Sequence, residues 1–222
     1  MPVSREDTLK AIKQMKEVSE KKKFTQSVDL MISLKDVDLK KTESRISEEV
    51  VLPHGLGKPR RVLIFAEGEL ARKAKDAGVD LLLARDDIEG LQKNRKRAKQ
   101  LADEYDSFLA QSDMMPAIGK QLGAVLGPRA KIPRPLPPTA DPKPMIERGR
   151  KTVRIRTREQ PTLHVPVGVE SMTDEQLADN IQAILDVIER KLERGLNQVG
   201  SVHVKTTMGK SAKIEVEHDS QR

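Results

Sequence analysis

The sequence predicts a mixed fold, in which an α/β unit is inserted into an α+β domain built from both ends of the chain. The middle of the chain alternates continuous apolar segments with helical ones, as parallel strands covered on both faces do. Both ends instead carry strands that alternate apolar and polar residues. The first end holds one helix and two strands, too few for a core, so we expect it to pack with the second. The predicted domains are 1–60 with 151–222, and 61–150.

The composition fits a folded basic protein with an aliphatic core. The 222 residues carry a formal net charge of +7, include one Tyr, three Phe and no Trp, and contain no cysteine. The charge points toward polyanionic partners, and the missing cysteines exclude disulfides, thiolate zinc sites and cysteine nucleophiles. The N-terminus lacks an apolar signal core, and no apolar run approaches the ~20 residues of a membrane span. We therefore expect an intracellular chain without a membrane partner.

The first end is predicted to form one helix and two strands. Ser4 is placed as an N-cap, and the apolar residues after it recur at helical spacing, which predicts a helix over 4–19. Alternation predicts a strand from Phe24 to Leu34, and a second strand covers 45–52. The loop 53–59, with two glycines and two prolines, ends the second strand.

The middle is predicted to be a small three-layer α/β unit, because strand and helix patterns alternate along it. The expected strands are 62–66, 79–84 and 106–110, and the expected helices are 69–77, 86–102 and 116–126. From Pro128 to Pro144 the chain is rich in proline, so neither a helix nor a central strand is expected there.

The second end is predicted to contain four strands and the longest helix. Strands are expected over 152–157, 162–167, 201–205 and 212–217. Thr173 and Gln176 form a capping box, which starts a helix that should run to Leu196 with Gly195 at its end. The last two strands form a hairpin that turns at 208–211.

The hairpin tip carries the most informative motif, Thr206–Gly209. Its hydroxyls, thioether and glycine, flanked by Lys205 and Lys210, suit a folded RNA surface without a deep pocket. The glycine permits a positive φ or the close approach of another backbone. An ordinary hairpin turn explains the same residues equally well.

A phenylalanine after a lysine run raises a similar choice. Phe24 follows Lys21–Lys23, so it either belongs to the core or packs on a ribose or base. The basic run from Lys93 to Lys99 is equally well explained as a solvated helix face.

No pattern predicts catalysis or a bound metal. A surface or hydrogen-bonded structural role is expected for His54, His164, His203 and His218, which fit no spaced metal motif. The chain also lacks a complete phosphate-binding loop and a dinucleotide fingerprint. We expect neither an enzyme nor a cofactor.

Several short motifs follow one another in a characteristic order. They are KFTQSVD (23–29), LPHGLGK (52–58), MPAIGK (115–120), LGPR (126–129), HVPVG (164–168), LADNI (177–181) and TTMG (206–209). Together they resemble the ribosomal protein L-one family of the large subunit. The stretch Ala130–Pro135 departs from the bacterial pattern and fits the archaeal form.

The resemblance implies a split α+β domain that binds large-subunit rRNA, with a Rossmann-like α/β domain inserted in it. It implies a place on the cytoplasmic ribosome, at the head of a mobile stalk beside the exit site, and a monomer when free. It also implies contact with exit-site tRNA, help in releasing deacylated tRNA, and repression of translation of the protein's own mRNA. A dedicated mRNA-binding repressor would use the same surface. A small nucleotide-using enzyme is disfavoured by the missing motifs.

The resemblance also implies a set of RNA-binding residues in the two end segments. Hydroxyls would bond ribose and phosphate, Met208 would pack on a sugar or base, and Asp29 would accept a hydrogen bond from a 2′-OH or base amine. Lysines would add a salt-sensitive term. The set is Lys23, Phe24, Thr25, Ser27, Asp29, His164, Ser201, Lys205, Thr207, Met208, Gly209 and Lys210.

Overall fold

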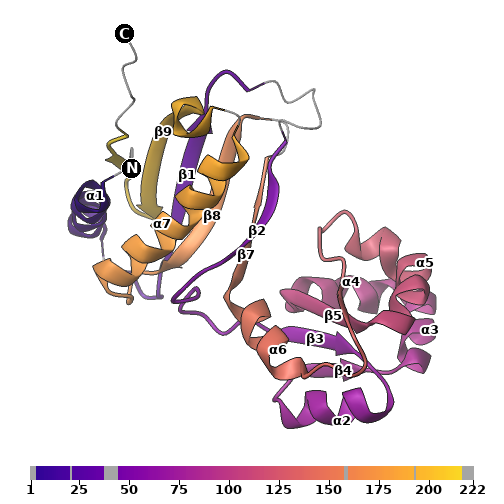
Figure 1. The fold of residues 1–222 in the computed structure, drawn as a ribbon. Helices are drawn as coiled ribbons and strands as arrows, with labels where there is room; N and C mark the ends of the chain where they lie inside the picture. Colours follow the sequence, from indigo (N-terminus) through magenta and orange to yellow (C-terminus); the bar gives the residue numbers. More distant parts are fainter. Residues whose placement is uncertain (1–3, 21, 38–44, 158–159, 193, 217–222) are drawn as a thin grey trace. The chain divides into compact units, whose positions relative to one another are not determined.

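The computed structural model describes residues 4–20, 22–37, 45–157, 160–192 and 194–216. It divides into two compact units, a terminal unit of residues 1–58 with 151–222 and an inserted unit of residues 59–150 (Figure 1). Each unit combines helices with its own sheet, and the predicted fold class is confirmed.

The terminal unit is built on a four-stranded antiparallel sheet in the order β10-β9-β1-β8. Its strands are β1 (Ser27–Leu34), β8 (Thr162–Val169), β9 (Val199–Thr206) and β10 (Ala212–Ile214). Two helices, α1 (Arg5–Val18) and α7 (Asp174–Lys191), cover one face of the sheet (Figure 1). The other face stays partly exposed, and we refer to it as the open face.

Strand β1 shows why one face is buried and the other is open. Its side chains alternate strictly between partly exposed and buried, because successive residues of a strand point to opposite faces. Val28, Leu30 and Ile32 are completely buried and join the core with α1 and α7. Ser27 and Asp29 lie on the open face, as the predicted alternation requires.

A two-stranded sheet completes the terminal unit. It pairs β2 (Ser47–Val51) with β7 (Thr152–Arg156). The loop after β2 is fastened to α7 by Asn180, which is completely buried. The Asn180 Oδ1 accepts a hydrogen bond from the His54 N–H (3.2 Å), and its Nδ2 donates to the carbonyls of Gly55 and Val167 (2.8 Å each).

The inserted unit has a parallel sheet in the order β4-β3-β5-β6. Its strands are β3 (Val62–Phe65), β4 (Leu81–Leu83), β5 (Ser107–Gln111) and β6 (Arg134–Leu136). Its helices are α2 (Gly68–Asp76), α3 (Arg85–Lys93), α4 (Arg95–Glu104), α5 (Met115–Leu126) and α6 (Pro142–Lys151). One apolar cluster packs α3, α4 and α5 on the sheet, and a second packs α2 and α6 on the opposite face. This is the predicted three-layer arrangement.

Three predicted elements were wrong in detail. The strand expected from Phe24 begins only at Ser27. The helix expected over 86–102 is two helices, because Asn94 leaves helical geometry and its side chain accepts a hydrogen bond from the Arg97 N–H (3.2 Å), starting α4. The long helix α7 ends at Lys191, and a short 3₁₀ turn from Gly195 to Gln198 follows, with Gly195 in the left-handed region.

The proline-rich stretch from Pro128 to Pro144 holds no central strand, as predicted, but a helix begins within it, which the prediction excluded. It contains the edge strand β6 and the start of the helix α6, whose first and third residues are Pro142 and Pro144. A helix tolerates proline in its first turn, because those N–H groups have no partner within the helix. No helix in the described part of the chain is long and apolar enough to cross a membrane.

Candidate nucleic-acid interface

Two segments far apart in the sequence meet at one end of the terminal sheet. They are Lys22–Gln26, which precedes β1, and Thr207–Lys210, which follows β9, and together we call them the tip. The Thr207 N–H donates to the Ser27 carbonyl (3.0 Å), and the Thr207 Oγ1 accepts from the Ser27 N–H (3.1 Å) and donates back to its carbonyl (3.3 Å). The tip is therefore one continuous surface.

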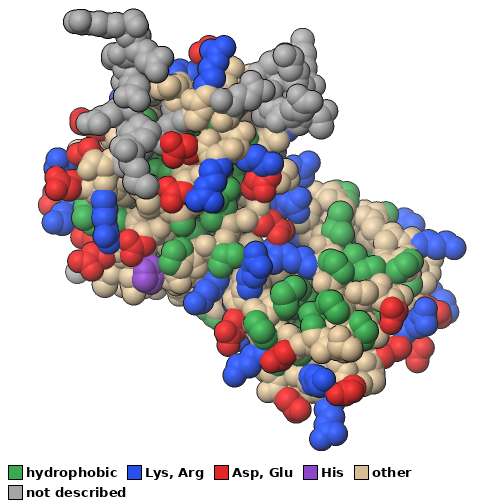
Figure 2. All heavy atoms as spheres, viewed as in Figure 1, with side chains coloured by type: hydrophobic (Ala, Val, Ile, Leu, Met, Phe, Trp, Pro, Cys, Tyr) green, Lys and Arg blue, Asp and Glu red, His purple; other side chains and the backbone are tan. Residues whose placement is uncertain are grey.

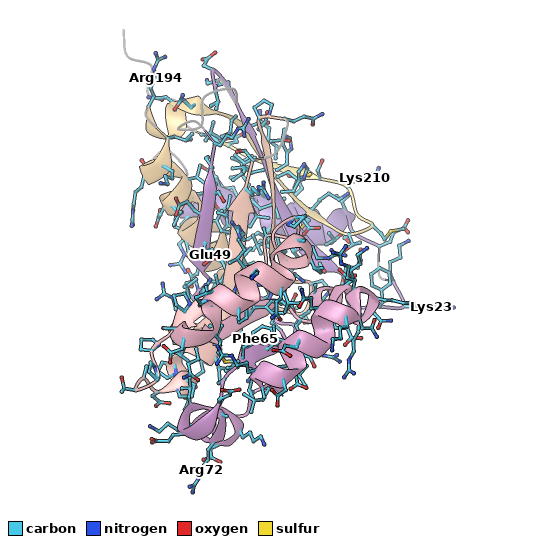
Figure 3. All side chains as sticks on the ribbon, turned by 90° about the vertical axis from the view of Figure 1, so that its right-hand side faces the viewer. Lys23, Glu49, Phe65, Arg72, Arg194 and Lys210 are labelled. Atoms are coloured by element: carbon cyan, nitrogen blue, oxygen red, sulfur yellow. The ribbon has the colours of Figure 1, made fainter. Side chains whose placement is uncertain are left out.

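The tip exposes two large apolar side chains among cations. Phe24 is 51% exposed and Met208 is 64% exposed, so the alternative that Phe24 belongs to the core is wrong. Lys23, Thr25 and Lys210 are also exposed. Figure 3 shows Lys23 and Lys210 on the same side of the terminal unit. Exposed apolar side chains beside lysines suit the stacking of bases or riboses next to phosphates.

Asp29 lies beside the tip on the open face, and its carboxylate accepts no hydrogen bond from the described residues. It lies opposite Lys205 of β9 and Pro166 of β8. Burial raises the pKa of the Asp29 carboxyl, although the nearby positive charges of Lys205, His164 and Lys58 counteract this rise. No described residue donates a hydrogen bond to it. A half-buried carboxylate without a donor is suited to receive one from a ligand.

Lys58 belongs to this group and was missed as a site residue. Its Nζ donates to the Ser27 Oγ at 2.6 Å, which brings a lysine from the loop after β2 to the first residue of β1. The buried Asn180 fixes the start of that loop, and the His54 Nε2 lies 3.1 Å from the Asp179 Oδ2. In the sequence Lys58 is only the last residue of the motif LPHGLGK, and nothing local indicates that it reaches β1.

The structure changes the explanation for two predicted contact residues. Gly209 does not lie in the left-handed region, and a Cβ there would instead collide with the Thr206 Oγ1 and approach the Ser19 Oγ. Its small size is therefore required by the protein's own packing. The Thr207 hydroxyl uses its proton on the Ser27 carbonyl, so it can offer a ligand only an acceptor.

Two other predicted residues lie on the open face away from the tip. His164 is exposed on β8 and faces Met31 of β1. Ser201 faces Ser33 at the other end of β9, six residues from Thr207 and hence about 20 Å from the tip. A ligand that contacts both Ser201 and the tip must therefore extend along the whole sheet.

The remaining histidines and the basic run from Lys93 to Lys99 do not belong to the tip. His203 is partly exposed opposite Met31, and His218 lies outside the described residues. The lysines and arginines of the basic run from Lys93 to Lys99 are exposed on the inserted unit. The face that carries α1 and α7 mixes positive and negative side chains (Figure 2), so the net charge is not concentrated there.

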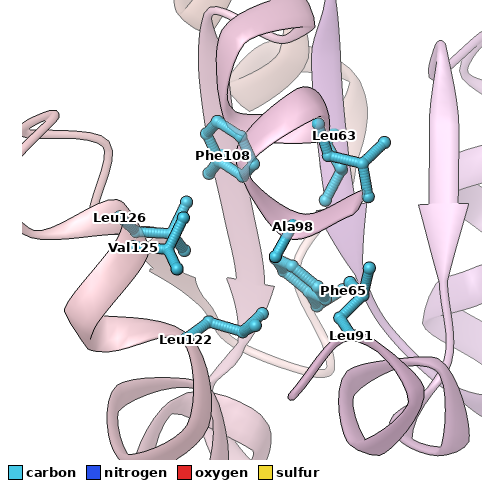
Figure 4. Close-up of a pocket in the computed structure, with 9 residues that line it drawn as sticks. Leu63, Phe65, Leu91, Ala98, Phe108, Leu122, Val125 and Leu126 are labelled. Carbon is cyan, nitrogen blue, oxygen red and sulfur yellow. The ribbon is translucent and has the colours of Figure 1, made fainter. Parts of the chain in front are cut away.

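A hollow in the inserted unit has a purely apolar lining (Figure 4). The lining residues are Leu63, Phe65, Leu91, Ala98, Leu101, Phe108, Leu122, Val125 and Leu126. None of these side chains can form a hydrogen bond with a phosphate or a base. Within the described residues, no group of three or more acidic or histidine side chains could hold a metal ion.

Comparison of the sequence with known proteins identifies one family. The sequence model described as the Ribosomal protein L1p/L10e family matches residues 12–210. The large ribosomal subunit protein uL1 of Methanothermobacter thermautotrophicus is 49% identical over 209 residues, which covers 94% of this chain and 99% of the relative. The proteins of the same name from Archaeoglobus fulgidus and Pyrococcus horikoshii are 46% and 45% identical, covering 96% and 97% of this chain and 100% and 98% of theirs.

Proposed function

We propose a function from one premise: the chain belongs to the ribosomal protein L1p/L10e family, as an archaeal-type protein of the large ribosomal subunit. Its terminal unit binds a folded segment of large-subunit rRNA through the tip and the adjoining part of the open face. The observation that carries this proposal is the joining of two distant segments into one surface, with Phe24 and Met208 exposed together.

Each part of the surface has a distinct task in this proposal. Phe24 and Met208 pack on exposed bases or riboses, which RNA presents at loops and bulges. Asp29 accepts a hydrogen bond from a 2′-OH or a base amine, and this acceptor distinguishes RNA from other polyanions. Lys23, Lys58, Lys205 and Lys210 lie close to phosphates and add affinity that falls with salt.

The proposal includes two further roles. On the cytoplasmic ribosome, the protein forms the head of the stalk beside the exit site, contacts exit-site tRNA and assists the release of deacylated tRNA. Free protein binds its own mRNA through the same surface and represses its translation, because an mRNA that folds like the ribosomal site presents the same groups. Ribosomal RNA and mRNA then compete for one site.

Crosslinking in cells, followed by sequencing of the bound RNA, tests this proposal. The expected result is one stalk region of the large-subunit rRNA, together with a smaller amount of the protein's own mRNA. Crosslinks spread evenly over many RNAs would overturn the proposal of a specific site. Recovery of the mRNA without the rRNA would show instead that the protein is a dedicated mRNA-binding repressor.

A further inference from the structure

We propose that Gln26 is the residue that positions the tip for RNA binding, and this inference rests on the proposed function. Gln26 lies between two predicted contact residues, Thr25 and Ser27, but its side chain is 0% exposed. It therefore cannot touch a ligand itself. Its effect on binding must pass through the residues it holds.

Gln26 links four segments of the terminal unit. Its Oε1 accepts a hydrogen bond from the Met208 main-chain N–H (3.0 Å). Its Nε2 donates to the Glu20 carbonyl (3.1 Å) and to the Glu170 Oε2 (3.1 Å), with a longer contact to the Ser19 Oγ (3.5 Å). One buried amide thus ties the tip to the exit of α1 and to the end of β8.

A second contact holds the same turn, on the side that faces the protein. The Ser19 Oγ and the Thr206 Oγ1 are 2.7 Å apart and share a hydrogen bond. Gly209 rests against this pair, with no room for a Cβ. The main chain of the turn is therefore held at Met208 by Gln26 and at Gly209 by the Ser19–Thr206 pair. The Met208 side chain is therefore exposed, while its main chain is held in place.

The position of Met208 in the free protein matters, because a residue that is already ordered loses less conformational entropy when RNA binds. A side chain that only stabilises the fold would change stability and leave the affinity of the folded protein unchanged. A positioning residue must also change affinity, and it must do so through Met208. This difference separates the two roles experimentally.

The test compares Gln26→Met with a control of similar burial. Methionine keeps the length of glutamine and removes every hydrogen bond of its amide. The control is Thr157→Val, which removes buried hydrogen bonds between the Thr157 hydroxyl and Ile46 (3.0 and 3.4 Å) beyond β7. Binding is measured with an in-vitro transcript of the stalk region of the large-subunit rRNA. We expect Gln26→Met to weaken binding about tenfold, and Thr157→Val less than twofold.

A double-mutant cycle with Met208→Ala identifies the route of the effect. In the Met208→Ala background, Gln26→Met should weaken binding less than threefold. In the free protein, exchange of the Met208 amide hydrogen should accelerate in Gln26→Met and not in Thr157→Val. An undiminished tenfold loss in the Met208→Ala background would show that Gln26 does not act through the tip. Wild-type affinity of folded Gln26→Met would also overturn the inference.

If Gln26→Met does not fold, Gln26→Asn takes its place, because its amide is one methylene too short to reach the Met208 N–H: a tenfold loss of affinity supports the inference, and wild-type affinity overturns it. Gln26→Glu is the conservative variant. Its carboxylate can still accept from the Met208 N–H but loses the donor facing Glu170. Gln26→Glu should therefore regain most of the affinity that Gln26→Met loses, although its melting temperature falls, and a loss as large as that of Gln26→Met would overturn the inference. The proposed function fails separately: if Met208→Ala itself binds the transcript normally, the tip is not the RNA surface.

Discussion

Replacing Met208 with alanine should weaken RNA binding while leaving the fold almost unchanged. Complete burial of a methionine side chain contributes about 1.5–3 kcal/mol. Met208 is 64% exposed in the free protein, so about that share remains to be gained from a ligand. The expected loss on truncation is therefore about 1–2 kcal/mol, which corresponds to about a 5- to 30-fold rise in Kd.

Ile132 provides a matched control for this prediction. It is 63% exposed, almost the same as Met208, and it lies on the inserted unit. Filter-binding titrations with the rRNA transcript should show the loss for Met208→Ala and none for Ile132→Ala. Thermal unfolding should show a small and similar effect of both. Equal affinities for the two variants would refute the assignment of Met208 to the interface, and so would a loss explained by unfolding of Met208→Ala.

Four other changes test separate parts of the structure. Asp29→Asn should weaken RNA binding about tenfold or more, as loss of a charged acceptor does. It should also raise the melting temperature at pH 7: since burial raises the pKa of Asp29, the charged form costs stability above that pKa, and the gain should fade as pH falls through it. A lower melting temperature at pH 7 contradicts this. Lys58→Gln should reduce the slope of log affinity against log salt by slightly less than one, and an unchanged slope places Lys58 away from phosphates. Gly209→Ala should lower stability by about 1–3 kcal/mol in chemical denaturation, because the new methyl collides with Thr206, whereas wild-type stability would mean that the turn relaxes freely. Bridging a deletion of 61–150 should leave a terminal unit that melts cooperatively and binds the transcript, and non-cooperative melting would show that it does not fold alone.

Local periodicity was enough to predict most of the fold. The alternation in 27–34 gave the buried face of β1, because a strand repeats every two residues. The apolar run at 62–65 gave the central strand of a parallel sheet, because both of its faces are covered. Errors arose where one residue decided the geometry, as Asn94 does between α3 and α4, or where Pro142 and Pro144 fit the first turn of a helix.

The candidate site was predicted less completely, because its order comes from contacts between distant segments. The exposed members, Phe24 and Met208, were found from residue type and resemblance. The sequence did not indicate Gln26, since two of its partners, Glu170 and Met208, lie in segments that only the fold brings together. Lys58 was passed over for the same reason. Residue type indicates what can touch a ligand, but it does not indicate what holds those residues in place.

The strand order β10-β9-β1-β8 has a consequence for the protein during its synthesis. Strand β1 is made early, yet both of its neighbours come from the last third of the polypeptide. At ~5–20 residues per second, β9 leaves the translating ribosome roughly 10–30 s after β1. The inserted unit has all its strands within one stretch and can fold during this delay. A nascent chain therefore has no tip, and only a completed molecule has the surface that the proposed function requires.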